Sequence, residues 1–141
     1  MTALVVLLIV IVATLAAGVT LRTRSGKVRA TASGGSDSAR GVDPALTAVG
    51  VGNGVPVILH FSAPWCGPCA SVRRVVARVL EDRPDGALDV ELDLDDNPVP
   101  ARQLGVMSLP TTFVFDAAGR ERYRVSGVPE VADLRTALAA L

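Results

Sequence analysis

The chain opens with a long apolar segment that has no polar face. Ala3 to Leu21 contains no charged residue and is mostly aliphatic. At about 1.5 Å per residue a helix of this length spans roughly 28 Å, close to the ~30 Å hydrocarbon core of a bilayer. The pattern therefore predicts one transmembrane helix over residues 1–21. A cleaved signal peptide is the alternative, because Ala16-Ala17-Gly18 offers a cleavage site, but no positive charge precedes the apolar run.

Beyond residue 41 the apolar pattern alternates between strand and helix. A nearly continuous apolar run at 55–61, bounded by turn residues, predicts a central strand buried on both faces. Apolar residues at helical spacing over 72–80 predict an amphipathic helix that ends before the Pro84-Asp85-Gly86 turn. The remaining pattern predicts strands at 87–94, 111–115 and 121–126, the last an edge strand, and helices at 97–104 and 131–141, with a short helix around 44–49. This order predicts an α/β domain with a mixed central sheet and helices on both faces.

A polar segment joins the apolar start to this domain. Residues 31–38 read TASGGSDS and contain nothing apolar larger than alanine, which is the composition of a flexible tether. The sequence thus predicts three parts. They are the transmembrane helix at 1–21, a basic juxtamembrane collar and flexible linker at 22–41, and a folded domain at 42–141.

The formal net charge of zero hides a separation of charge along the chain. Residues 22–40 hold five basic residues and one acidic residue, a net of +4, and the rest of the chain from residue 41 has a net of −4. An acidic domain argues against nucleic acid as a partner. Basic residues beside a span tend to stay on the cytoplasmic side, so the collar predicts a single-pass membrane protein with a cytoplasmic domain. The same charges could also hold the linker against anionic lipid.

Both cysteines lie in the segment Trp65-Cys66-Gly67-Pro68-Cys69, between the first strand and the helix after it. A helix N-terminus favours thiolate over thiol, so Cys66 is the candidate nucleophile and the more shielded Cys69 the resolving thiol. Gly67 leaves room for a substrate backbone, and Pro68 suits a first helical turn. A structural zinc site, a permanent structural disulfide and an inert pair are the alternatives, and the zinc site lacks ligands because His60 is the one histidine.

The cysteine segment, followed by Gly105 to Thr112 before another apolar strand, resembles the thioredoxin family over Val42 to Leu141. The resemblance implies a thioredoxin fold in which Pro110 is a cis-proline facing the cysteines, and Leu109 and Thr111 flank the groove for substrate backbone. An extended peptide paired beside Pro110 would present its disulfide to Cys66. Substrate contacts are then expected at six residues: Trp65, Gly67, Pro68, Leu109, Pro110 and Thr111.

Two positions depart from the family pattern. Thioredoxins usually carry a buried aspartate six residues before the first cysteine, and this chain has His60 there. Where they often carry a lysine on the next strand, this chain has Glu91. We expect His60 and Glu91 to form an inverted pair beneath Cys69, with His60 moving the proton in catalysis, since imidazole can titrate near neutrality.

The resemblance implies a protein-disulfide reductase that contributes to cell redox homeostasis, and the apolar start of the chain predicts that it is tethered to a membrane. Its substrates would be proteins with disulfides, and it would need neither an organic cofactor nor a metal. The electron donor would be a thioredoxin-reductase-like flavoprotein on the cytoplasmic side or a membrane electron carrier on the outside. Two alternatives remain open: an extracytoplasmic thiol-disulfide interchange protein of the oxidase or cytochrome-maturation type, and a non-catalytic binding module with a thioredoxin fold.

Overall fold

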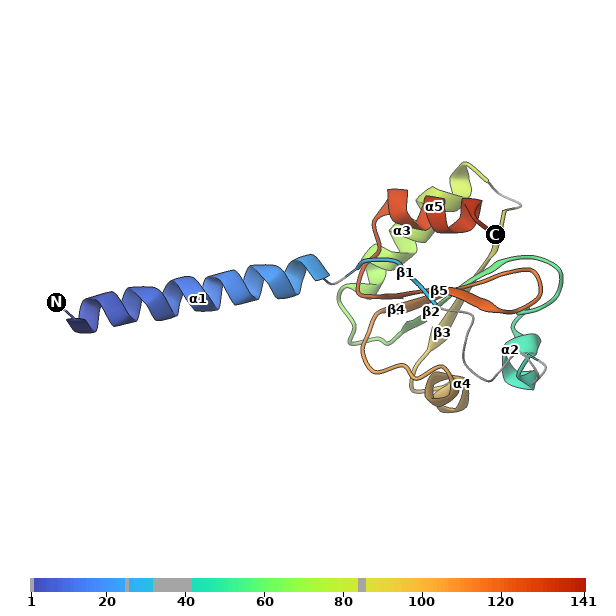
Figure 1. Ribbon diagram of the computed structural model, residues 1–141. Helices are drawn as coiled ribbons and strands as arrows, with labels where there is room; N and C mark the ends of the chain where they lie inside the picture. The colour runs from blue at the N-terminus through green and yellow to red at the C-terminus, as the bar shows by residue number, and fades with distance from the viewer. Residues whose placement is uncertain (1, 25, 32–41, 84–85) are drawn as a thin grey trace.

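The computed structural model describes residues 2–24, 26–31, 42–83 and 86–141. Its centre is a five-stranded sheet with the strand order β1-β5-β4-β2-β3 (Figure 1). The strands are β1 (Arg29–Ala30), β2 (Val57–Ser62), β3 (Leu88–Asp93), β4 (Thr111–Phe115) and β5 (Glu121–Ser126). The helices are α1 (Thr2–Arg24), α2 (Pro44–Ala48), α3 (Cys69–Glu81), α4 (Pro98–Gln103) and α5 (Val131–Ala139). β2 pairs parallel with β3 and antiparallel with β4, which confirms the predicted mixed sheet.

Strand β2 lies between β4 and β3, and every one of its residues is buried. Its side chains alternate between two cores, as the period of a strand requires. Val57, Leu59 and Phe61 pack in the core that also holds Leu46 of α2 and Ala101 of α4. Ile58 packs in the other core, with apolar residues of α3 and α5. Figure 1 shows the same arrangement, with α3 and α5 above the sheet and α2 and α4 below it.

Local sequence explains where the helices begin and end. Asp43 caps α2 by accepting a hydrogen bond from the Ala45 N–H at 2.8 Å, and Pro44 occupies the first helical turn. Along α3, Cys69, Val72, Val76 and Val79 are buried at the spacing of one helical face, while Arg73 and Arg74 are exposed. Each helix and strand predicted beyond residue 41 is present, with ends that differ by a few residues.

Helix α1 carries the apolar start of the chain. Its side chains from Val5 to Val19 are exposed, with Leu7 at 60% and Ile9 at 62%. Within the residues that the structure describes, no helix meets the combined length and hydropathy needed to cross a bilayer.

The segment after α1 differs from the predicted linker. Arg29 and Ala30 form β1, which pairs antiparallel with Arg124 and Tyr123 of β5. Most of the expected tether, residues 32–41, lies outside the described residues, but 26–31 lies against the sheet and is no free linker. The prediction that β5 is an edge strand is therefore wrong, because β1 covers its outer side.

Candidate active site

The two cysteines form a disulfide at the edge of the sheet where β2 ends. The sulfur atoms lie 2.01 Å apart and the Cα atoms 5.5 Å apart. The Cys66 N–H donates to the Ala63 carbonyl at 3.0 Å, which holds the loop that follows β2 in a tight turn. Cys69 is the first residue of α3, so Cys66 precedes the helix rather than starting it.

Burial separates the two sulfurs in the way the sequence predicts. Cys66 is partly exposed, whereas Cys69 is 1% exposed, and its Sγ lies 3.9 Å from the carbonyl oxygen of Phe61 on β2. Cys66 is therefore the cysteine that is accessible from solvent, and Cys69 lies inside the fold.

Pro110 lies at the same edge of the sheet as the disulfide. The Leu109–Pro110 peptide bond is cis, as the family resemblance predicts. Thr111, the next residue, is the register partner of Phe61, so the start of β4 lies beside the end of β2. The Pro110 carbonyl accepts the Gly127 N–H at 2.8 Å, and Thr111 Oγ1 donates to the Ser108 carbonyl at 2.7 Å. These bonds fix the loop that the substrate backbone would meet.

The predicted substrate-contact residues differ in exposure. Trp65 is 68% exposed, Gly67 and Pro68 are exposed, and Leu109 is partly exposed. Pro110 is buried and Thr111 is 3% exposed, so the side chain of Thr111 supports the loop. Met107, at 92% exposure, was not among the predicted residues. In the sequence, only its position in the loop before Pro110 indicates that Met107 lies near the predicted substrate contacts.

His60 is buried on the sheet face that α3 covers, but its partner is not the predicted one. Its Nε2 lies 3.2 Å from Oδ1 of Asp89, and the residue is 1% exposed. Glu91 is the register neighbour of His60 on β3, yet its carboxylate accepts three hydrogen bonds from Arg73 of α3 at 2.8–2.9 Å. The carboxylate of Glu91 is bonded to the guanidinium of Arg73. The expected His60–Glu91 pair is therefore wrong, and the observed pairs are His60–Asp89 and Arg73–Glu91.

The Arg73–Glu91 contact shifts the pKa values of both of its groups. The hydrogen bond from Arg73 is the largest influence on Glu91, and it lowers the pKa of Glu91 to about 2 despite partial burial. Glu91 correspondingly raises the pKa of Arg73. Both groups are therefore charged throughout the neutral pH range.

A signal in the sequence could have located Asp89. Asp89, Glu91 and Asp93 alternate along β3 with Leu88, Val90 and Leu92. Val90 and Leu92 pack in the core on the α2 and α4 side. The three acids must then point to the face where His60 lies, since successive side chains of a strand alternate.

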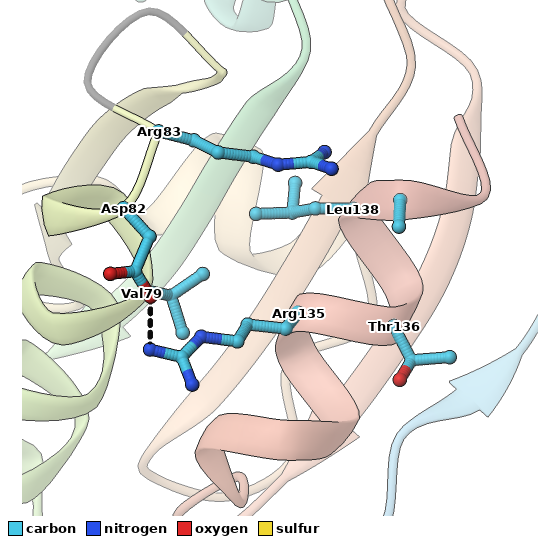
Figure 2. A pocket seen from close by; sticks show the side chains of 7 residues that line it. Val79, Asp82, Arg83, Arg135, Thr136 and Leu138 are labelled. Carbon is cyan, nitrogen blue, oxygen red and sulfur yellow. Dashed lines mark hydrogen bonds and ion pairs between the residues drawn. The ribbon is translucent and has the colours of Figure 1, made fainter.

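A hollow of about 280 Å³ lies elsewhere, between the end of α3 and α5. Figure 2 shows Arg135 bonded to Asp82 on one side of it and Arg83 on the other, with Leu138 between them. From Cys69 to Asp82 the helix rises roughly 20 Å, so this hollow is distant from the disulfide. The candidate active site is consequently the exposed surface around Cys66.

Comparisons with known proteins show what the chain is similar to. The thioredoxin family model matches residues 49–140, which include Cys66, Cys69 and Pro110. Thioredoxin of Pyropia yezoensis is 38% identical over 80 residues, covering 57% of this chain and 75% of that protein. Thioredoxin 1 of Synechococcus elongatus is 38% identical over 76 residues, covering 54% of this chain and 71% of its own.

Solved structures show a similar fold. The crystal structure of chloroplastic thioredoxin z aligns with a TM-score of 0.59 at 25% identity, covering 70% of this chain and 89% of that one. The X-ray structure of Fasciola hepatica thioredoxin aligns with a TM-score of 0.57 at 26% identity, covering 68% and 89%.

Proposed function

The chain belongs to the thioredoxin family, and from that premise we propose that it is a membrane-tethered protein-disulfide reductase that contributes to cell redox homeostasis. The Cys66–Cys69 disulfide beside the cis-Pro110 loop carries the proposal. It places a partly exposed sulfur and a buried sulfur within one bond of each other, which two-step thiol exchange requires.

The reaction starts from the reduced dithiol. The Cys66 thiolate attacks one sulfur of a substrate disulfide, forms a mixed disulfide and releases the other substrate sulfur as a thiolate. The Cys69 thiolate then attacks Cys66, which releases the second substrate thiolate and leaves the Cys66–Cys69 disulfide. Two electrons pass to the substrate, and a donor of two electrons must reduce the pair again. No organic cofactor or metal takes part in the exchange.

His60 is assigned the proton transfer that accompanies the second attack. Because a carboxylate only accepts hydrogen bonds, the contact with Asp89 places the imidazole hydrogen on Nε2 and leaves Nδ1 able to take a proton. His60 immediately precedes Phe61, whose carbonyl contacts Cys69 Sγ. This proximity along the chain, together with the burial of both His60 and Cys69, supports the assignment.

Substrate binding is assigned to the surface around Cys66. An extended peptide beside Leu109, Pro110 and Thr111 would pair through its backbone, while Trp65, Gly67 and Pro68 form the other side. The exposure of Trp65 at 68% and of Gly67 and Pro68 supports this arrangement.

The tether is assigned to α1. The uncharged aliphatic run from Ala3 to Leu21 and the exposure of the side chains from Val5 to Val19 support the assignment. The basic residues after it favour a single-pass topology with the catalytic domain in the cytoplasm. A thioredoxin-reductase-like flavoprotein would then be the electron donor.

Insulin reduction driven by dithiothreitol tests the enzymatic part of the proposal. The full chain in detergent should turn over many times per Cys66–Cys69 pair, whereas Cys66→Ser should give no more than the background rate. A Ser71→Ala variant, changed near the start of α3 but retaining both thiols, serves as the control. Equal rates for the native chain and Cys66→Ser would leave only the binding-module alternative.

Labelling with a membrane-impermeant thiol reagent tests the topology. In intact reduced cells the reagent should miss Cys66, and it should reach Cys66 once the cells are lysed. Prompt labelling in intact cells would instead place the domain outside. An extracytoplasmic thiol-disulfide interchange role with a membrane electron carrier would then replace the cytoplasmic one.

A further inference from the structure

We infer that the active-site edge of the domain faces the lipid surface, so that its partners are disulfides held close to the membrane by integral membrane proteins. This inference rests on the proposed membrane tether. It concerns the orientation of the domain, which neither the family nor the thiol chemistry determines.

The orientation follows from how the chain enters the domain. After α1 ends at Arg24, the Gly26 N–H already donates to the Ser126 carbonyl of β5 at 2.7 Å. β1 continues the pairing, and the Thr31 N–H donates to the Arg122 carbonyl at 2.9 Å. Thr31 Oγ1 adds a bond to the Glu121 carbonyl at 3.1 Å. The segment is therefore bound along β5 and holds the domain directly after the helix.

Gly26 fixes the first of these contacts. It is buried with φ +85°, and a Cβ at this position would lie 2.3 Å from the carbonyl oxygen of Val128. A larger residue could not keep this backbone path. The entry point of the chain is therefore set by tight packing as well as by hydrogen bonds.

The entry point lies at the same edge of the sheet as the disulfide. Ser126, which accepts from Gly26, is the register partner of Thr111, and Thr111 is the register partner of Phe61. The Phe61 carbonyl in turn contacts Cys69 Sγ. From β1 to β2 there are three strand spacings, roughly 14 Å in all. Figure 1 shows α1 reaching the domain on the side where the loops into α3 and β4 lie.

The short connection keeps this edge near the bilayer. From Leu21 to Gly26 the chain extends at most about 17 Å, even when fully stretched. The headgroup layer beyond the hydrocarbon core takes up about 5–8 Å of that distance. Gly26 is therefore held within about 9–12 Å of the headgroup surface and the disulfide within roughly 25 Å of it, which places this edge of the sheet nearer the lipid than the opposite edge.

Exposed side chains at this edge suit such a position. Trp65, at 68% exposure, directly precedes Cys66, and Met107, at 92% exposure, lies in the loop before Pro110. Tryptophan favours the membrane interface. The expected partner is a disulfide in a membrane protein, in a loop close to the lipid. The Cys66 thiolate would attack it, and Cys69 would release the reduced partner, as in the exchange above.

Trp65 is the single tryptophan of the chain and reports its own distance from lipid. The full chain is reconstituted in phosphatidylcholine–phosphatidylglycerol vesicles with a dansyl group on some headgroups, and energy transfer from Trp65 is measured. A second reporter, Trp65→Phe with Val55→Trp, places the tryptophan at an exposed position before β2, at the opposite edge. Transfer from Trp65 should exceed transfer from Val55→Trp several-fold.

Release of β1 should remove that difference. Gly26→Ala combined with Thr31→Pro breaks the packing and the hydrogen bond that hold the segment, so both reporters should give similar transfer. Gly18→Ala is the matched control, because a Cβ there meets nothing within 4 Å, and the native difference should persist.

The outcomes separate this inference from the proposal beneath it. Failure of the native chain to float with the vesicles would overturn the tether and the orientation together. Flotation with equal transfer from the two reporters would overturn the orientation and leave the tether in place. Retention of the native difference after release of β1 would show that β1 does not set the orientation.

Discussion

At the scale of single residues, His60 is distinguished by what surrounds it. It is fully buried on β2, with Asp89 Oδ1 3.2 Å from its Nε2, and the next residue, Phe61, contacts Cys69 Sγ through its carbonyl. An imidazole whose one nitrogen is held by a carboxylate has a fixed orientation, which a group that transfers protons needs.

The His60–Asp89 contact should matter for the rate of insulin reduction. His60→Ala should lower it by about tenfold or more, the lower end of what a positioned acid–base group contributes. Asp89→Asn keeps a hydrogen-bond acceptor without the charge and should change the pH profile between 6 and 9. Asp95→Asn, an exposed acid on the following loop, is the control. Unchanged pH profiles in both His60→Ala and Asp89→Asn would remove His60 from the mechanism.

Glu91 should contribute stability that depends on pH. Its pKa falls from an ordinary 4.5 to about 2 because Arg73 binds the carboxylate. The contribution is therefore complete above pH 4.5 and is lost as the pH falls toward 2.

Glu91→Gln should lower the urea midpoint at pH 7 and match the native chain near pH 2. Urea unfolding at several pH values measures this, with the exposed Glu81→Gln as the charge-matched control. A deficit of equal size at pH 7 and pH 2 would attribute the loss to packing rather than to the ion pair.

The sequence predicts the roles of the cysteines and the site of the cis-proline, because the short motif and the family resemblance locate both. The partner of His60 could not be predicted in the same way. Register makes Glu91 its neighbour, but the bond goes diagonally to Asp89, and Arg73 from another element takes Glu91. Side-chain contacts of this kind depend on which of several nearby partners has the more favourable geometry in the folded domain.

At the scale of elements, the turn between β4 and β5 is organised by Asp116. This carboxylate is 6% exposed and accepts the N–H groups of Ala118 and Arg120 at 3.0 and 2.9 Å. Burial acts to raise the pKa of Asp116, but hydrogen bonds from the Arg120 backbone and from the Arg120 and Arg122 side chains outweigh it, and the pKa is lowered.

Asp116→Ala should destabilise the domain by about 1–3 kcal/mol, since it removes the charged acceptor of the hydrogen bonds from Ala118, Arg120 and Arg122 that hold the turn. The free energy of unfolding at pH 7 measures the loss, and Asp133→Ala on the outer side of α5 gives the control. Equal stability of the two variants would mean that the turn forms without the carboxylate.

Apolar periodicity explains why most elements were predictable and β1 was not. The helix over 72–80 and the strand at 111–115 carry their pattern in their own residues. β1 has two exposed residues and no pattern, and it forms only because β5 offers unpaired backbone groups. An element of that kind follows from its partner and not from its own sequence.

At the scale of the whole molecule, the predicted boundary at residue 42 marks the start of the apolar pattern but not of the folded unit. Residues 26–31 belong to the same sheet as residues 121–126. The charge division near residue 40 is real in the sequence, yet the basic side includes a strand of the domain. Composition separates the segments, whereas backbone pairing joins two of them.

The pairing of β1 with β5 should also affect whether copies of the domain associate. A strand with bare N–H and C=O groups at a sheet edge is a template for another chain. A fragment of residues 42–141 would leave β5 in that state and should self-associate as its concentration rises. A fragment of residues 26–141 carries its own cover and should sediment as a monomer at the same concentrations. Identical sedimentation of the two fragments would contradict this expectation. If only the shorter fragment associates, β1 protects the domain against aggregation by covering the backbone groups of β5.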